Sequence, residues 1–383
     1  MIPQHGTLEI SRSRLAHNVS LFREHLGKQM LLCAALKADA YGHGSDLVSP
    51  LLINAGVKWC AVYSFEELTA HRHHPWEGIL VLSPLVLPSC MDPSLESGLR
   101  DALKENVRVT VADGESAVYL GSLAHNALGR EIPVHIQIDT GLTRLGITPD
   151  AARELAWVIY KHPGLRLEGV YAHFSHGDVP GHESLLQQST ILHETAARLR
   201  EKHPNLMVHL QNSGGAWNLQ PPASQGLDMV RLGIALYGLQ PSSDHPIPGL
   251  QPVARLTAPI LAIHRVPPGT GVGYGHTFVT RRTTWLGIVP VGYADGYPRL
   301  LSNKCVAQVV GKEVPVVGRV SMDQIIVDLT DVRALRLGED PVTVISWNPS
   351  DKNSLDEMAK TCGTIGYELA THLGGRLKRV LVD

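Results

Sequence analysis

The feature that most constrains the fold is a series of eight short apolar runs between residues 31 and 238. The runs are continuously apolar rather than alternating, which is typical of strands buried on both faces of a parallel sheet. Amphipathic stretches such as 183–202, with apolar residues three and four apart, lie between them. In chain order the runs end at Lys37, Ser64, Pro84, Asp113, Asp139, Phe174, Ser213 and Gly238.

Strands and helices in this number and order indicate a (β/α)8 barrel. A doubly wound open sheet is the alternative, but it gives no reason for eight strands. After Pro241 the sequence is rich in β-branched residues and broken by glycine, proline and aspartate, with no long helix expected before Leu355. We therefore predict an α/β fold, with a TIM-type barrel over 10–240 and a mostly antiparallel β domain made of 1–9 and 241–383.

Composition limits the classes of partner. The formal net charge of the 383-residue chain is −2, so nucleic acid and anionic membranes are not expected partners. The five cysteines form no CxxC pair, and neither a signal peptide nor a membrane-spanning apolar run is present. We expect a cytoplasmic protein. The 20 histidines show no metal-ligand spacing, and His71, His73 and His74 come closest to a cluster, so no metal is expected.

Polar residues lie at the expected carboxyl ends of several strands, where barrel enzymes place their chemistry. They are Lys37, Asp139, Arg144, His173, Asn212, Ser213 and Arg231. This set is rich in cations and small-residue turns, and it contains no central carboxylate pair and no Ser-His-Asp order. The strand ends therefore predict a site for an anionic ligand.

Lys37 is the first candidate for the chemistry. It follows an apolar run and precedes ADAYGHG, so its ammonium group would be largely desolvated. Desolvation disfavours the charged form, which makes the amine a usable nucleophile and base. A lysine that reaches out to solvent at a strand end is the alternative. The following turn favours the functional interpretation, because Tyr41 could reach a phosphate near the barrel mouth.

Two glycine-containing segments are compatible with phosphate binding. They are NSGG (212–215) after the seventh run and RLGIALYG (231–238) at the eighth. Barrels commonly bind phosphate after these two strands, with backbone N–H groups and the start of a short helix. Ser213, Gly233 and Ile234 are the residues placed to donate hydrogen bonds.

With these motifs the chain resembles the alanine racemases along nearly its whole length. The motifs that carry the resemblance are ALKADAYGHG (35–44), DTGLTRLG (139–146), YAHFSHGD (171–178), NSGG (212–215), RLGIALYG (231–238), GVGYGHTF (271–278), VGYADGYPR (291–299), GRVSMDQ (318–324) and IGYEL (365–369). The resemblance implies a fold-type III enzyme that uses pyridoxal 5'-phosphate to racemise alanine. It also implies a homodimer in which the β domain completes the active site of the other subunit.

The resemblance assigns roles to individual residues. Lys37 would hold the cofactor as a Schiff base and act as one catalytic base, and Tyr274 of the other subunit would be the second base. The residues that match phosphate ligands are Tyr41, Ser213, Gly233, Ile234 and Tyr367. Arg231 matches the arginine that bonds the pyridine nitrogen, and His173 supports it. The residues that match substrate-binding positions are Arg144, Met322 and Asp323, and Asp178 and Arg299 match an access-corridor pair.

The sequence departs from the family at two positions and leaves two other classes of protein to consider. The family usually has a lysine, often carbamylated, at the position of Gln137, where it braces the arginine that matches Arg144. A glutamine cannot be carbamylated, and its amide oxygen is a weaker partner than an anion. Ser321 stands where cysteine often precedes the Met-Asp pair, so a serine or broad-specificity racemase is an alternative. A non-catalytic carrier of the cofactor would lack the β domain, and a fold-type III decarboxylase would have a cysteine-bearing motif that is absent here.

Overall fold

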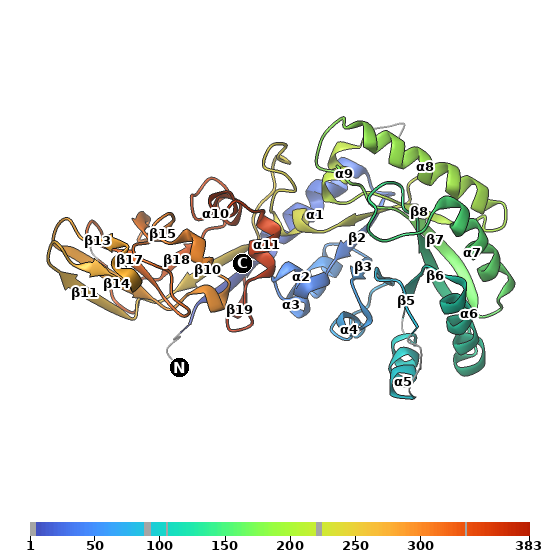
Figure 1. Cartoon of the computed structure of the whole chain (residues 1–383), viewed down its shortest axis with the longest axis horizontal. Coiled ribbons are helices and arrows are strands. Elements are labelled where there is room, and N and C mark those ends of the chain that lie inside the picture. Colours follow the sequence, from blue (N-terminus) through green and yellow to red (C-terminus); the bar gives the residue numbers. More distant parts are fainter. Residues whose placement is uncertain (1–4, 88–92, 105, 220–223, 334) are drawn as a thin grey trace.

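Eight parallel strands close into a barrel (Figure 1) in the computed structural model, which describes residues 5–87, 93–104, 106–219, 224–333 and 335–383. The strands are β2 (Leu31–Ala35), β3 (Trp59–Val62), β4 (Gly78–Val81), β5 (Val107–Val111), β6 (Ile132–Gln137), β7 (Leu165–Tyr171), β8 (Met207–His209) and β9 (Met229–Leu232). The first and last of them pair in parallel, with Leu31 opposite Met229, and this pairing closes the barrel. The predicted (β/α)8 barrel is confirmed, and an open sheet is excluded.

The strands end earlier than the apolar runs suggested. Strand β2 ends at Ala35, two residues before Lys37, and β9 ends at Leu232 although its run continues to Gly238. The apolar runs extend past the strands because the turns at the rim are buried as deeply as the strands. Ile234 and Tyr237, in the 3-10 turn η2 (Ile234–Tyr237), are both 0% exposed. Apolar composition therefore could not mark where the strand stops.

Helices connect the strands and cover the outside of the barrel (Figure 1). They are α1 (Arg12–Leu26), α3 (Ser45–Asn54), α4 (Phe65–Leu68), α5 (Pro93–Ala102), α6 (Gly114–Leu123) with the π-helical turn η1 (Ala124–Leu128), α7 (Pro149–Lys161), α8 (Glu183–Arg200) and α9 (Ser213–Asn218). The segment α2 (Lys37–Tyr41) is instead a left-handed turn at the rim of the barrel. The long helix expected over 183–202 is confirmed by α8. Within the described residues, we find no helix whose length and apolar character would let it cross a lipid bilayer.

The interior of the barrel has an apolar side and a polar side. Alternate residues of β2, β3, β4 and β9 form a separate apolar cluster made of Cys33, Trp59, Ala61, Leu80 and Met229. The opposite side carries polar side chains from β5 to β8 that are at most 1% exposed, namely Thr110, His135, Tyr171 and His209. Buried polar groups are costly unless they are hydrogen-bonded. The polar side must therefore hold an internal network of hydrogen bonds.

The second domain is built on a six-stranded sheet in the order β16-β15-β18-β10-β1-β19, with smaller sheets β11-β14-β17 and β12-β13. Its strands are β1 (Thr7–Ser11), β10 (Ala254–Ala258), β11 (Ala262–Val266), β12 (Gly271–Val272), β13 (Phe278–Val279), β14 (Thr284–Val289), β15 (Val306–Val309), β16 (Lys312–Pro315), β17 (Ile325–Asp328), β18 (Val342–Ile345) and β19 (Lys378–Val382). Every pair except β1 with β19 is antiparallel, which confirms the predicted mostly antiparallel domain.

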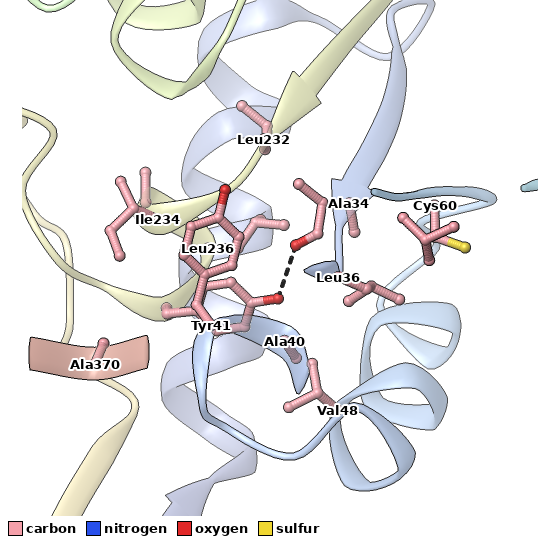
Figure 2. Packing of buried hydrophobic residues seen from close by; sticks show 14 of the residues in the cluster. Ala34, Leu36, Ala40, Tyr41, Val48, Cys60, Leu232, Ile234, Leu236 and Ala370 are labelled. Carbon is pink, nitrogen blue, oxygen red and sulfur yellow. Dashed lines mark hydrogen bonds between the residues drawn. The ribbon is translucent and has the colours of Figure 1, made fainter. Parts of the chain in front are cut away.

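The β domain also contains short helical segments, of which α11 (Gly366–Thr371) reaches the rim of the barrel. The others are α10 (Leu355–Cys362) and the 3-10 turns η3 (Tyr274–His276), η4 (Tyr293–Asp295) and η5 (Arg299–Leu301). Figure 2 shows Ala370 of α11 near Tyr41 and Ile234 of the rim. A Cβ atom on Gly42 would lie 2.0 Å from the carbonyl oxygen of Ala370, so only glycine allows this close approach. The β domain thus packs directly on the turn that follows Lys37.

Gly238 provides a test of how tightly the rim is built. It ends η2 with φ 76°, and a Cβ atom there would lie 1.8 Å from the carbonyl oxygen of Gln251. We expect Gly238→Ala to lower the free energy of unfolding by more than ~2 kcal/mol, because a backbone clash adds to the cost of the left-handed conformation. Chemical denaturation measures this change. Gly249→Ala is the matched control, since its φ is 83° but only side-chain atoms of Leu21 lie near, at 3.6 Å or more. Equal losses in the two variants would contradict the expectation.

Candidate active site

A cavity of about 490 Å³ opens at the carboxyl ends of the barrel strands, and we call it the barrel-mouth cavity. Nine of the predicted site residues line it: Lys37, Tyr41, Arg144, His173, Ser213, Arg231, Gly233, Ile234 and Tyr367. Eight come from the barrel, and Tyr367 comes from α11 of the β domain. A second cavity of about 580 Å³ lies beside Tyr293 and His372, but its lining includes neither lysine nor arginine. The chemistry predicted from the sequence therefore converges on the barrel mouth.

Lys37 stands directly after β2, with its side chain half-buried. Burial lowers the pKa of its amine, and the positive charges of Arg144 and Arg231 lower it further, while the carboxylate of Glu67 acts in the opposite direction. A lowered pKa increases the fraction of neutral amine near neutral pH. The neutral form is the one that attacks a carbonyl group or accepts a proton.

The turn after Lys37 has an unusual backbone conformation. Residues 38–41 all have φ between 52° and 55°, a left-handed conformation that costs an L-residue roughly 1–2 kcal/mol. Two carboxylates hold the turn. Glu67 accepts a hydrogen bond from the amide of Ala38 at 2.8 Å, and Asp39 accepts one from the amide of Ser45 at 2.7 Å. The sequence did not predict this turn or the role of Glu67.

One wall of the cavity collects hydrogen-bond donors. The hydroxyl oxygen of Ser213 lies at the start of α9 and accepts hydrogen bonds from the amides of Gly233, at 3.0 Å, and Ala235, at 3.4 Å. A Cβ atom on residue 233 would lie 2.5 Å from the Tyr41 hydroxyl oxygen, so a larger residue there would have to displace the Tyr41 ring. Two hydroxyl groups and backbone amides gathered in this way suit a phosphate group.

Arg231 also lines the cavity and is only 5% exposed. Its Nη2 donates to the carbonyl oxygen of Ala172 at 2.7 Å and lies 3.2 Å from Nδ1 of His173. Its Nη1 lies 2.6 Å from Nδ1 of His209. Within the described residues Arg231 has no salt bridge to an acidic side chain. A buried guanidinium of this kind can meet an uncharged acceptor, such as a ring nitrogen, of a ligand in the cavity.

His173 is neutral in this environment. Burial lowers its pKa to about 3, and the nearby charges of Arg231, Arg144 and Lys37 act in the same direction. An arginine has no acceptor, so Nδ1 of His173 must accept the hydrogen bond from Arg231. Its own ring hydrogen is therefore on Nε2, where it is free to support a further group.

Gln137 and Arg144 both line the cavity, but they do not contact each other as the sequence suggested. Gln137 is 7% exposed and Arg144 is exposed, and no hydrogen bond between them occurs in the described part of the chain. Asp139, at the same strand end, accepts hydrogen bonds from the amides of Gly141 and Thr143 at 3.0 and 3.1 Å. Asp139 is therefore a turn-forming residue, and among the described residues no side chain makes a hydrogen bond or salt bridge to Arg144.

The remaining predicted residues lie in the β domain and do not line this cavity. Tyr274 is 73% exposed in η3, and Met322 is 52% exposed. The carboxylate of Asp323 pairs with Arg376 at 2.8 Å. Asp178 and Arg299, the expected corridor pair, also lie outside the lining. Within one subunit these side chains therefore do not join the nine residues of the cavity.

Outside the cavity, the histidine group noted in the sequence is arranged differently from its order in the chain. The ligand atoms of Asp46, His73 and His74 lie within 4.8 Å of one another. His71 instead lies 3.3 Å from the hydroxyl of Ser49. The residue that joins His73 and His74 is therefore Asp46, and not the sequence neighbour His71.

Both domains of the chain are similar to known proteins. The family models described as alanine racemase, N-terminal domain, and alanine racemase, C-terminal domain, match residues 10–241 and 253–381. The alanine racemase of Synechocystis sp. is 35% identical over 392 residues and covers 100% of both chains. That of Chlorobaculum tepidum is 36% identical, covering 97% of this chain and 94% of the relative. The solved alanine racemase of Streptomyces coelicolor A3(2) superposes with a TM-score of 0.87 at 33% identity, covering 99% and 98% of the two chains.

Proposed function

Since this chain belongs to the alanine racemase family, we propose that it interconverts L- and D-alanine in the barrel-mouth cavity, with pyridoxal 5'-phosphate as cofactor. The observation that carries the proposal is the convergence of nine predicted residues on one cavity around a lysine of lowered pKa. Similarity over both domains argues against the single-barrel carrier, which would have no β domain.

The cavity fits the cofactor in the chemistry of its walls. Lys37 supplies an amine for the aldehyde, and the hydroxyls of Tyr41 and Ser213, the amides around Gly233 and Ile234, and Tyr367 would hold the phosphate. Arg231, which also lines the cavity, would face the pyridine nitrogen. When bound, pyridoxal phosphate supplies an electron sink that makes the α-proton of an amino acid acidic.

Arg231 would limit the strength of that sink. A guanidinium in a protein does not give up its proton, so it donates a hydrogen bond and leaves the facing nitrogen unprotonated. The ring then withdraws fewer electrons than a protonated ring would. We propose that this restricts side reactions such as transamination, and that His173 keeps Arg231 in place.

Racemisation needs a base on each face of the α-carbon. Lys37 would serve one face. Tyr274, which is exposed in its own subunit, would serve the other face from a second copy of the chain. The same copy would bring Met322, through its backbone amide, and Asp323 to the substrate, and Arg144 would lie near the substrate carboxylate. The functional unit is therefore a homodimer with shared active sites.

Reductive trapping tests the cofactor assignment. The purified chain is incubated with pyridoxal phosphate, reduced with borohydride and digested, and the labelled peptide is identified by mass spectrometry. We expect a single label on Lys37, because burial and two nearby arginines lower the pKa of its amine and so favour the nucleophilic form. Lys58, whose ammonium pairs with Glu77 at 2.8 Å, is an internal control and should remain unlabelled. A label on another lysine, or none, would overturn the assignment.

A further inference from the structure

A chain of hydrogen bonds crosses the polar side of the barrel interior from Arg231 to Glu168. Nη1 of Arg231 lies 2.6 Å from Nδ1 of His209, and Nε2 of His209 lies 3.0 Å from Nδ1 of His135. Nε2 of His135 then lies 3.3 Å from Oε2 of Glu168. Both histidines are 0% exposed, so no solvent reaches the links between them.

Chemistry fixes the direction of this chain. A guanidinium has donors only, so Nδ1 of His209 must accept from Arg231 and the hydrogen of His209 must be on Nε2. That hydrogen can only be donated to Nδ1 of His135, which leaves Nε2–H of His135 for Glu168. Protonation of either ring would bring two donors face to face. Burial, the largest cause, lowers the pKa of both histidines, in agreement with two neutral rings.

Glu168, at the far end of this hydrogen-bond chain, is held firmly by Arg108. Arg108 donates from Nε to Oε2 of Glu168 at 2.7 Å and from Nη2 to Oε1 at 3.2 Å, and its guanidinium lies 4.4 Å from the centre of the Trp59 ring. Burial acts to raise the pKa of Glu168, but hydrogen bonds from His135 and Arg108 outweigh it and hold the pKa well below its usual range. Glu168 therefore stays ionised and can act only as an acceptor.

We propose that Glu168 and His135 are positioning residues for racemisation. By fixing His209 as an acceptor, they hold Arg231 in the orientation that serves the cavity, as outer partners do for ligating histidines in metal sites. This inference rests on the proposed function, because the group that Arg231 meets is part of that proposal. Neither Glu168 nor His135 lines the cavity.

Replacing Glu168 with glutamine would disrupt the direction of these hydrogen bonds. Its amide has one oxygen and one NH2 group, but Arg108 and His135 both require an acceptor. If the NH2 group faced His135, every hydrogen bond of the chain would reverse, and His209 would present Nδ1–H to Arg231. If it faced Arg108, the anchor would be lost. The first orientation removes the acceptor that Arg231 requires, and the second loosens the side chain that holds His135.

Nitrogen-15 NMR of histidine-labelled protein tests the direction of the hydrogen bonds between Arg231 and Glu168. Signals are assigned by single substitutions and recorded near neutral pH, with and without added pyridoxal phosphate. We expect His135 and His209 to be neutral Nε2–H tautomers in both samples. An imidazolium ion or an Nδ1–H tautomer at either residue would overturn the proposal. The measurement needs no activity and no variant at position 168, so it stands whatever becomes of the cofactor assignment.

Kinetics of the cofactor-loaded enzyme test the positioning role. We expect Glu168→Gln to lower kcat about 10-fold to 100-fold, to leave the KM for alanine within about 3-fold, and to raise the ratio of transamination to racemisation. The matched control is Arg166→Gln. Arg166 has a half-exposed side chain, and its Nη2 lies 3.3 Å from Oε1 of the same carboxylate. It is not one of the residues that connect Glu168 to Arg231. If the two variants behave alike, Glu168 is merely structural.

Discussion

Replacing Lys37 with alanine is expected to lower racemase activity by at least ~10⁴-fold while leaving the fold intact. The substitution removes both the amine that would hold the cofactor and one of the two proposed bases. The half-buried side chain projects into the barrel-mouth cavity, so shortening it leaves the strand and its pairing unchanged. Formation of D-alanine from L-alanine measures the activity, and circular dichroism checks the fold.

Two controls separate chemistry from structure in that experiment. Lys202→Ala removes another lysine, one whose ammonium lies 5.9 Å from the centre of the Tyr160 ring on the outer surface, and should retain full activity. Added methylamine should restore part of the activity of Lys37→Ala, since a free amine can occupy the vacated space and accept a proton. Wild-type activity in Lys37→Ala would show that another residue carries the reaction.

Mixed dimers are expected to recover activity that neither parent variant shows. Alone, Lys37→Ala and Tyr274→Phe should each be almost inactive, because each removes one proposed base from every site. In a dimer of one subunit of each kind, one site pairs an intact Lys37 with an intact Tyr274, and the other site lacks both. Random pairing makes half of the dimers mixed, so an equal mixture should show about a quarter of the wild-type specific activity.

The recovered activity should appear only when subunits of the two variants can pair in one dimer. A sample in which they cannot exchange is therefore the control. The two variants are combined either by co-expression or after separate folding at a concentration that prevents exchange, and only the first sample should regain activity. Tyr160→Phe, on the barrel surface and 51% exposed, should be fully active in any mixture. If co-expressed Lys37→Ala and Tyr274→Phe stay inactive, the two residues do not meet across subunits, and the shared-site proposal is wrong.

Much of the barrel was predictable because its strands differ from their surroundings in a local property. Each of the eight apolar runs overlaps one barrel strand, and the rim residues lie near the carboxyl ends of those strands. The ends themselves were less predictable. Turn η2 is as apolar and as buried as the strand before it, so no local signal separates Leu232 from Ile234.

Other parts of the site depend on contacts that no local pattern encodes. His135 and His209 are 74 residues apart in the chain and meet only because β6, β7 and β8 are neighbours with a particular register. A histidine at an inward-facing position in each of two apolar runs was the available signal. Glu67 was also missed, because a carboxylate that accepts backbone amides from two loops resembles any exposed helix residue in sequence.

The turn at residues 38–41 has a consequence for chirality. Its backbone is the mirror image of an ordinary helical turn, and this is the conformation in which D-residues are most stable. Two of the residues held in this conformation, Ala38 and Ala40, are L-alanines. A semisynthetic chain with D-alanine at these two positions would relieve roughly 1–2 kcal/mol at each. The backbone beside Lys37 is therefore less stable than its stereoisomer would be, and the carboxylates of Asp39 and Glu67 keep it ordered.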